Sequence, residues 1–245
     1  METPAILLRV VPYQESSAIL RFLTRDHGAL SVMGRGVRSG GKGKGVPGLF
    51  ASGSLQLQLR PQRDLQNLGS FRPHRSGLAL ARDLRTLGAA SVLAEVVLLN
   101  PGEEADPPLF QLLLGALEAL ESSPGSQAPW ILLGAGWVLM HHLGFSPEVE
   151  RCVRCQQSLP DTEILRFHVE AGGVMCSACQ GSSPSTGVGP RVGPGAREQL
   201  ASLVSGRPLS EEEGLPAHLK LLRTFMEFHL GARKPLASFD FLLGS

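Results

Sequence analysis

Four cysteines in two closely spaced pairs constrain the fold of this chain more than any other feature. Two residues separate Cys152 from Cys155, two separate Cys176 from Cys179, and twenty residues lie between the pairs. Thiolates at this spacing on tight turns can bind one cation, and two such turns complete the tetrahedral Cys₄ shell of a structural Zn²⁺ site. The pattern predicts a zinc ribbon over residues 150–180.

Between the two pairs, residues 164–169 and 172–175 have the composition of strands. A shell of four thiolates leaves no position for water, so we expect the metal to stabilise the fold and not to catalyse. Two alternatives stay open: free or redox-active thiols, and His168 in place of one cysteine, although a strand histidine is more often packed or on the surface. No secretory signal opens the sequence, which favours a reducing compartment over disulfides.

A glycine-rich basic loop, residues 34–45, contains four cations and no carboxylate: Arg35, Arg38, Lys42 and Lys44. Glycine lets a backbone approach a ligand closely, and mobile cations attract a polyanion. Strand-like runs at 29–33 and 49–59 flank the loop, so it joins two strands and faces water. The loop predicts a clamp for a phosphate backbone; a solvated loop without a ligand is the alternative.

Part of this loop matches the nucleotide-binding P-loop motif at every defined position but one. Gly36 is followed by Gly41-Lys42 at the spacing that the motif requires. Gly43 stands where Ser or Thr would bind Mg²⁺. A P-loop also needs a helix directly after its lysine, and the segment 43–48, rich in glycine and containing Pro47, cannot begin one. Nucleotide binding is therefore disfavoured.

The charge of the chain is unevenly distributed. The formal net charge is +1 over 245 residues, yet residues 1–75 hold eleven Lys or Arg against four acids, a balance of +7, and the remaining 170 residues carry −6. Such asymmetry is typical of a polyanion-binding module joined to an ordinary domain. The candidate contacts are Arg9, Arg21, Arg35, Arg38, Lys42, Lys44, Arg60 and Arg63.

Five short strand-like runs occupy the first 71 residues: 5–11, 18–24, 29–33, 49–59 and 65–71. Their number and spacing predict a small, partly open barrel of the OB type, with any small β-meander as the alternative. Grooves on such barrels bind single strands by neutralising phosphates and stacking bases on aromatic side chains. Among Tyr13, Phe22, Phe50 and Phe71, only Tyr13 is expected to be exposed.

After Arg75 the sequence becomes rich in Leu and Ala at helical spacing. One helix is predicted within 76–99, its buried face formed by Leu80, Leu84, Leu87, Ser91, Ala94 and Leu98. Further helices are predicted to begin at Pro107 with Asp106 as cap, to span 128–143 with Gly144 as stop, and to span 196–204 and 215–230. Trp130, Trp137 and Met140 are interpreted as core residues, and 181–195 as a linker.

No catalytic motif is present, so we expect a protein that is not an enzyme; a zinc-dependent enzyme is the less favoured alternative. The apolar run 130–140 is too short to cross a bilayer, so no membrane association is expected. An alternative from another functional class is a zinc-containing protein-interaction module, whose basic barrel would bind a protein partner instead of DNA.

Several local strings resemble the RecO family of bacterial recombination mediators. They are Pro12-Tyr13-Gln14-Glu15-Ser16, Leu23 to Gly28, Gly34-Arg35-Gly36-Val37-Arg38, Leu143-Gly144-Phe145 with the cysteine pairs that follow, and Phe228 to Leu242. The resemblance implies an α+β multidomain protein with an N-terminal OB-fold barrel at 1–76, a helical domain at 77–149 and 181–245, and an inserted Cys₄ zinc finger at 150–180.

The resemblance also implies a function in DNA repair. Proteins of this family bind single- and double-stranded DNA, anneal complementary strands and, with the RecR protein, help to load RecA onto DNA coated by the single-stranded DNA-binding protein. A cytoplasmic, nucleoid-associated location follows from that role. Contact with the single-stranded DNA-binding protein is expected on the helical domain, where Lys220, Arg223 and Arg233 are weak candidates.

Overall fold

The computed structural model describes residues 1–39, 45–60, 62–100, 102, 104–160, 162–180, 188–207 and 214–243. The chain forms two compact units, Met1–Ala128 and Pro129–Ser245, and each is described by itself. No helix among the described residues is both long and apolar enough to cross a membrane.

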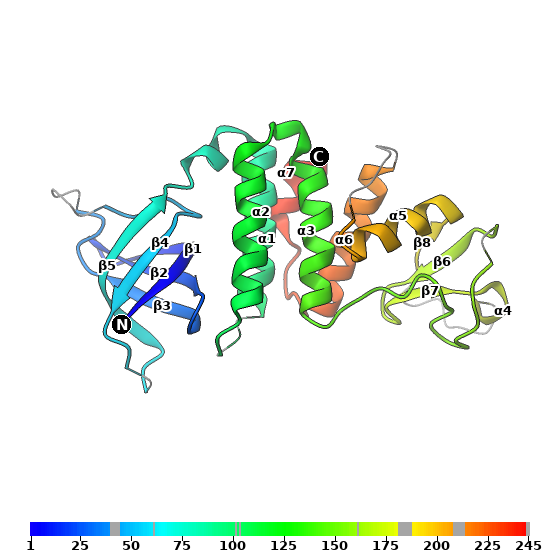
Figure 1. The fold of residues 1–245 in the computed structure, drawn as a ribbon, viewed down its shortest axis with the longest axis horizontal. Helices are drawn as coiled ribbons and strands as arrows, with labels where there is room; N and C mark the ends of the chain where they lie inside the picture. The colour runs from blue at the N-terminus through cyan, green and yellow to red at the C-terminus, as the bar shows by residue number, and fades with distance from the viewer. Residues whose placement is uncertain are drawn as a thin grey trace. The chain divides into compact units, whose positions relative to one another are not determined.

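The first unit begins with a closed five-stranded barrel (Figure 1). Its strands are β1 (Glu2–Tyr13), β2 (Ser17–Thr24), β3 (Gly28–Gly34), β4 (Ser52–Leu57) and β5 (Leu65–Arg75). Around the ring they follow the order β1-β2-β3-β5-β4, with β3 and β5 parallel and every other pair antiparallel. The predicted OB-type barrel is confirmed, and its ring is closed and not partly open.

The barrel core is formed by apolar side chains that alternate with outward-facing residues along the strands. Leu7 on β1, Leu20 and Phe22 on β2, Val32 on β3 and Leu55 on β4 are all fully buried in one cluster. Neighbouring positions along each strand point to opposite faces, so the residues between these point outward. The outward set on β1, β2 and β3 includes arginines, which places charge on the exterior of the barrel.

Two helices complete the first unit, α1 (Leu84–Leu99) and α2 (Pro107–Ser122), together with the short turns η1 (Leu78–Arg82) and η2 (Gly125–Gln127). As predicted, Asp106 caps α2, and its carboxylate accepts a hydrogen bond from the backbone N–H of Leu109 at 2.9 Å. Arg75, the last residue of β5, forms ion pairs with Glu118 and Glu121 of α2. The barrel is thereby fixed to its own helices.

The predicted buried face of α1 is wrong. Leu84 is 65% exposed, Leu87 and Ser91 are half-buried, and of the predicted face within the helix only Ala94 is buried. The buried residues are instead Thr86, Gly88, Ala89, Ala90, Val92, Leu93, Ala94, Val96 and Val97. The helix is apolar on nearly every side, so the spacing of its leucines could not identify the face that packs.

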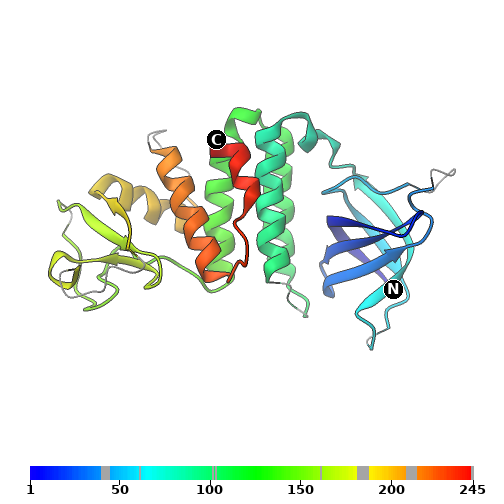
Figure 2. The same cartoon turned by 180° about the vertical axis from the view of Figure 1, so that it is seen from behind.

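The second unit has a helical core. It contains α3 (Ala128–His142), α5 (Pro194–Val204), α6 (Leu215–His229), the turn η3 (Ala237–Phe239) and α7 (Asp240–Leu243). Trp137 of α3 is fully buried and its ring centroid lies 5.1 Å from that of Phe225 on α6, which confirms its interpretation as a core residue. Gly144 ends α3 with φ of +89°, as predicted for a helix stop. Figure 2 shows α6 beside α7 from behind.

A small three-stranded module is inserted between α3 and α5. Its strands are β6 (Leu165–His168), β7 (Gly173–Met175) and β8 (Val188–Val192), in the order β7-β6-β8, with the short helix α4 (Ser177–Gln180). The two predicted ribbon strands correspond to β6 and β7. The prediction of a linker at 181–195 is wrong for residues 188–195, the part that the structure describes, because β8 and the start of α5 lie there. We call this module, residues 148–192, the ribbon. His229 Nε2 of α6 lies 2.9 Å from the carbonyl oxygen of Val169, which connects the ribbon to the helical core.

Candidate nucleic-acid and metal sites

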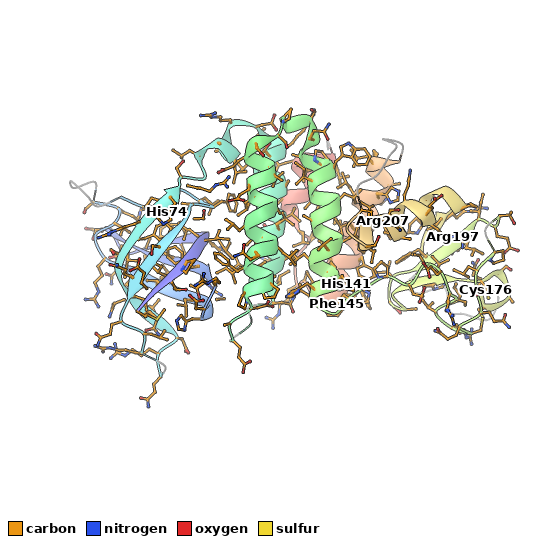
Figure 3. The ribbon with its side chains drawn as sticks, in the orientation of Figure 1. His74, His141, Phe145, Cys176, Arg197 and Arg207 are labelled. Carbon is orange, nitrogen blue, oxygen red and sulfur yellow. The ribbon has the colours of Figure 1, made fainter. Side chains whose placement is uncertain are left out.

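Four cysteine thiols converge in the ribbon. Their sulfur atoms all lie within 4.8 Å of one another. Cys152 and Cys155 come from a turn before the sheet, Cys176 follows β7 directly, and Cys179 lies in α4. Figure 3 shows Cys176 in the ribbon. Cys152 is buried, Cys155 is exposed and the other two are half-buried. This cluster can hold a metal ion, since its donors converge on one point.

The protonation of the thiols fits a site for a cation. Burial raises the pKa of Cys152, but backbone hydrogen bonds from Cys155, Cys176 and Arg154 outweigh it and lower that pKa to about 6. Hydrogen bonding to Cys176, with burial and the other thiols, raises the pKa of Cys179 to about 12. Four adjacent thiolates repel one another, and a divalent cation supplies the compensating charge.

His168 is not part of the cysteine cluster; in the described part of the chain the metal-ligand group consists of the four cysteines. Its side chain is buried on β6, where the backbone pairs with Gly173 and Val188. Burial, together with the nearby positive charge of Arg166, lowers its pKa. A neutral packed histidine agrees with the interpretation preferred from the sequence.

The barrel places two of the candidate cations side by side. Arg9 on β1 lies directly opposite Arg21 on β2, and Arg21 lies opposite Ser31 on β3. Directly opposed residues on antiparallel strands project from the same face. Arg9 is exposed, Arg21 is half-buried, and no ion pair among the described residues involves either side chain. Two cations without an ion-pair partner in the described part of the chain therefore lie side by side on the outer face of β1 and β2.

Apolar side chains accompany this pair. Val11 is paired with Ile19, and Ile19 with Met33, in the next outward-facing row of the same three strands. Val11 is 38% exposed and Tyr13, near the end of β1, is 44% exposed, as predicted for Tyr13. Phe22 and Phe50 are buried in the core. This face therefore combines two cations with exposed aromatic and apolar side chains.

The first half of the glycine-rich loop lies at one end of the barrel. The guanidinium of Arg38 donates a hydrogen bond to the carbonyl of Gln14 at 3.1 Å, and its backbone N–H donates to the carbonyl of Ser16 at 2.9 Å. Arg35 is exposed. These contacts hold the start of the loop against the turn between β1 and β2. The candidates Lys42 and Lys44 lie outside the described residues.

Arg60 and Arg63 lie at the other end of the barrel, in the loop between β4 and β5. Both are exposed. The amide side chain of buried Gln66 accepts a hydrogen bond from the Arg60 N–H and donates to the carbonyls of Arg60 and Arg63. Sequence reasoning missed Gln66, because a polar strand residue carries no signal of which loop it will hold.

Not every cation of the basic segment is available to a ligand. Arg25 forms an ion pair with Asp26 at 2.8 Å, and the two acids of α2 pair with Arg75. In the second unit, Arg223 forms ion pairs with Glu227 and Asp240. The sequence made Arg223 a weak candidate for contact with the single-stranded DNA-binding protein, and these ion pairs already engage its charge. Counting charges in the sequence therefore overestimates the number of free cations.

A pocket of about 740 Å³ lies in the second unit, between the start of α5 and residues 149–159. Arg197 on α5 and Arg207 beyond it, both labelled in Figure 3, line it together with Glu150 and Glu198. Arg197 is only 7% exposed and donates a hydrogen bond to the carbonyl of Pro160. Two cations and two carboxylates balance, so the pocket does not favour a polyanion.

Comparison with known protein families shows to which family the chain belongs. The family described as Recombination protein O N terminal matches residues 1–76, and that described as Recombination protein O C terminal matches residues 81–237. The chain belongs to the RecO family. Together the two matches cover the barrel, helices α1 to α6 and the cysteine cluster, which agrees with the resemblance found in the sequence.

Individual members of the RecO family are similar over most of their length. The DNA repair protein RecO of Anaeromyxobacter sp. (strain K) is 30% identical over 240 residues, covering 93% of this chain and 91% of its own. The DNA repair protein RecO of Synechococcus sp. (strain JA-3-3Ab) is 32% identical over 250 residues, covering 91% of this chain and 79% of its own. These RecO proteins are named for DNA repair.

Proposed function

We propose that this protein binds the sugar-phosphate backbone of single- and double-stranded DNA with its barrel. The observation that carries the proposal is the outward-facing pair of exposed Arg9 and half-buried Arg21, for which no ion pair with an acid is found among the described residues. In OB-type barrels, the face of strands 2 and 3 and the loops after strands 1 and 4 bind oligonucleotides. Here Arg21 lies on strand 2 beside Arg9 on strand 1, Arg38 contacts the loop after strand 1, and the loop after strand 4 carries Arg60 and Arg63.

The proposed mechanism is electrostatic. Neutralising phosphates on two strands lowers their mutual repulsion, so base pairing can drive annealing without nucleotide hydrolysis. If about four to six phosphates are bound, the slope of log affinity against log salt is about −3 to −4 for single strands. The protein thus acts without being an enzyme.

Membership of the RecO family supports the rest of the proposed function. With RecR, the protein helps to load RecA onto DNA coated by the single-stranded DNA-binding protein, in the cytoplasm at the nucleoid. Lys220 and Arg233 are exposed on the helical unit and remain candidates for the contact with the single-stranded DNA-binding protein. Arg223 is the weakest of the three candidates, because its guanidinium already binds two carboxylates.

For the metal site we propose Zn²⁺, held by Cys152, Cys155, Cys176 and Cys179. Four sulfur donors suit Zn²⁺, and a shell that they fill leaves no position for substrate. When bound, the ion supplies folding energy and not catalysis. Backbone hydrogen bonds lower the pKa of Cys152 to about 6, which favours its thiolate form at neutral pH.

We also propose the three-part division that the resemblance implies: 1–76 for DNA binding, 77–149 with 181–245 for the helices, and 150–180 for the zinc finger. The family matches, which end at 76 and begin at 81, support the first boundary. The position of β6, β7 and α4 between α3 and α5 supports the insertion, and β8, which pairs with β6, extends the inserted sheet beyond residue 180.

A strand-annealing assay tests the proposed function. Two complementary oligonucleotides, each labelled with one member of a fluorophore–quencher pair, are mixed with the full-length protein without nucleotide. Faster annealing than in buffer alone is expected, and the combined variant Arg35→Gln, Arg38→Gln, Lys42→Gln and Lys44→Gln should show a flatter dependence on salt. Annealing at the rate of buffer alone refutes the proposal, and an unchanged slope refutes the role of the loop.

A further inference from the structure

The ribbon carries a second cross-strand arginine pair. Arg166 on β6 lies directly opposite Arg191 on β8 in the antiparallel sheet, and both side chains are exposed. Residues in this register project from one face, with Cβ atoms about 4.5–5.5 Å apart. The ribbon sheet, at β6 and β8 in Figure 1, therefore presents two neighbouring cations on one face.

Neither cation is neutralised within the described residues. The ion pairs found there involve Arg25, Arg75 and Arg223, and no hydrogen bond or ion pair joins Arg166 or Arg191 to an acid. Like charges placed directly opposite each other destabilise a sheet. An external anion lying across both arginines would remove this repulsion.

The carboxylates nearest to Arg166 in sequence form no ion pair with it. Glu163 precedes β6 and Glu170 follows it, and none of the ion pairs found among the described residues joins either carboxylate to Arg166 or Arg191. Ile164, two residues before Arg166, is 59% exposed. An arginine pair with an exposed apolar neighbour matches the combination on the barrel, where Arg9 and Arg21 accompany Val11.

We infer that Arg166 and Arg191 form a second phosphate-binding site, which holds the second strand while the barrel holds the first. The inference rests on the proposed function, since it assumes that the barrel binds DNA. The two pairs belong to different compact units, so each offers its own site for a backbone. Annealing requires both strands to be neutralised, and two separate sites supply this.

The test compares the full-length double variant Arg166→Gln/Arg191→Gln with Arg207→Gln/Lys234→Gln. The control removes two exposed cations from the same compact unit, one after α5 and one after α6, to which no binding role is assigned. Fluorescence anisotropy measures the affinity for a labelled single strand over a range of salt concentrations, and the annealing assay measures capture of its complement. Metal content and circular dichroism check the fold of each variant.

The ribbon variant should bind one strand with wild-type affinity and salt slope. Its annealing rate should fall, and the slope of log rate against log salt should flatten by about 1.4, because each lost phosphate contact contributes about 0.7. The charge-retaining variant Arg166→Lys/Arg191→Lys should anneal close to the wild-type rate, which separates loss of charge from loss of fold.

Two results overturn the inference. If the ribbon variant anneals like the control, the pair binds no second strand. If it lowers single-strand affinity and annealing in parallel, the pair contacts the same strand as the barrel. Failure of the wild-type protein to anneal at all refutes the proposed function instead, so the two failures are distinguishable.

Discussion

At the scale of single residues, His218 shows how burial changes the protonation of a side chain in the second unit. It lies on α6, and its Nε2 is 2.8 Å from the Gln199 Oε1 of α5, so that one hydrogen bond joins the two helices. Burial lowers the pKa of His218 from the usual 6.5. The folded protein therefore favours the neutral ring, and the unfolded chain takes up a proton at a higher pH than the folded chain does.

Stability should consequently fall as the pH drops through 6.5 toward the folded pKa of His218. The loss is about 1.4 kcal/mol for each unit by which burial lowers that pKa. His218→Gln keeps a partner for Gln199 but does not titrate, so it should lose less stability between about pH 7 and pH 5. Urea unfolding followed by tryptophan fluorescence measures this, because Trp130 and Trp137 both belong to the second unit.

The exposed His74 provides the control for this comparison. His74→Gln should reproduce the pH profile of the wild-type protein. Parallel stability curves for His218→Gln and the wild-type protein would show that the buried histidine does not couple folding to pH.

At the scale of elements, aromatic contacts connect the ribbon to the helical core. The ring centroid of Phe167 on β6 lies 6.1 Å from that of Phe225 on α6, and Phe225 lies 5.1 Å from the buried Trp137. The ring centroid of His229 lies 4.2 Å from that of Phe225 with the two planes tilted by 45°, and its Nε2 contacts the carbonyl oxygen of Val169. Displacement of the ribbon therefore removes neighbours from the aromatic core.

Metal removal should accordingly be detected at Trp137. Chelation of the proposed Zn²⁺ should unfold the ribbon, shift the emission of Trp137 to longer wavelength and lower the midpoint of thermal unfolding of the second unit. The variant Trp130→Phe isolates the signal from Trp137. An emission spectrum unchanged after verified metal loss would show that the helical core folds independently of the ribbon.

Sequence patterns predicted the elements more fully than the contacts between them. Local signals such as the Asp106 cap and the Gly144 stop act within a few residues, and the structure has both. The buried face of α1 was predicted wrongly because several of its faces are apolar. The ion pairs of Arg75 were not predictable, since its partner Glu121 lies 46 residues away.

The same limit applies to the candidate sites. The cysteine spacing predicted the convergence of the four thiols, because the two residues between the members of each pair let both of their thiols face one point. The sequence pattern of the strands did not predict that Arg9 lies opposite Arg21, because the strand register depends on a β-bulge between Leu7 and Arg9. The count of charged residues did not indicate that Arg25 forms an ion pair with its neighbour Asp26.

At the scale of the whole molecule, the arginines fall into two groups, those in ion pairs with acids and those without such a pair among the described residues. Paired arginines such as Arg75 and Arg223 hold elements together, whereas Arg9 and Arg21 on the barrel, and Arg166 and Arg191 on the ribbon, remain exposed to a ligand. A net charge of +1 is therefore compatible with a DNA-binding protein. The central claim is that free cations on the outer face of the barrel bind the DNA backbone.

The most direct test is the salt dependence of single-strand affinity for the full-length protein. The wild-type slope should be about −3 to −4, and Arg9→Gln/Arg21→Gln should flatten it by about 1.4 through loss of two phosphate contacts. The control Arg82→Gln/Arg85→Gln, which removes two exposed cations outside the barrel, should keep the wild-type slope. Equal slopes for all three proteins would contradict the claim that the barrel face binds DNA.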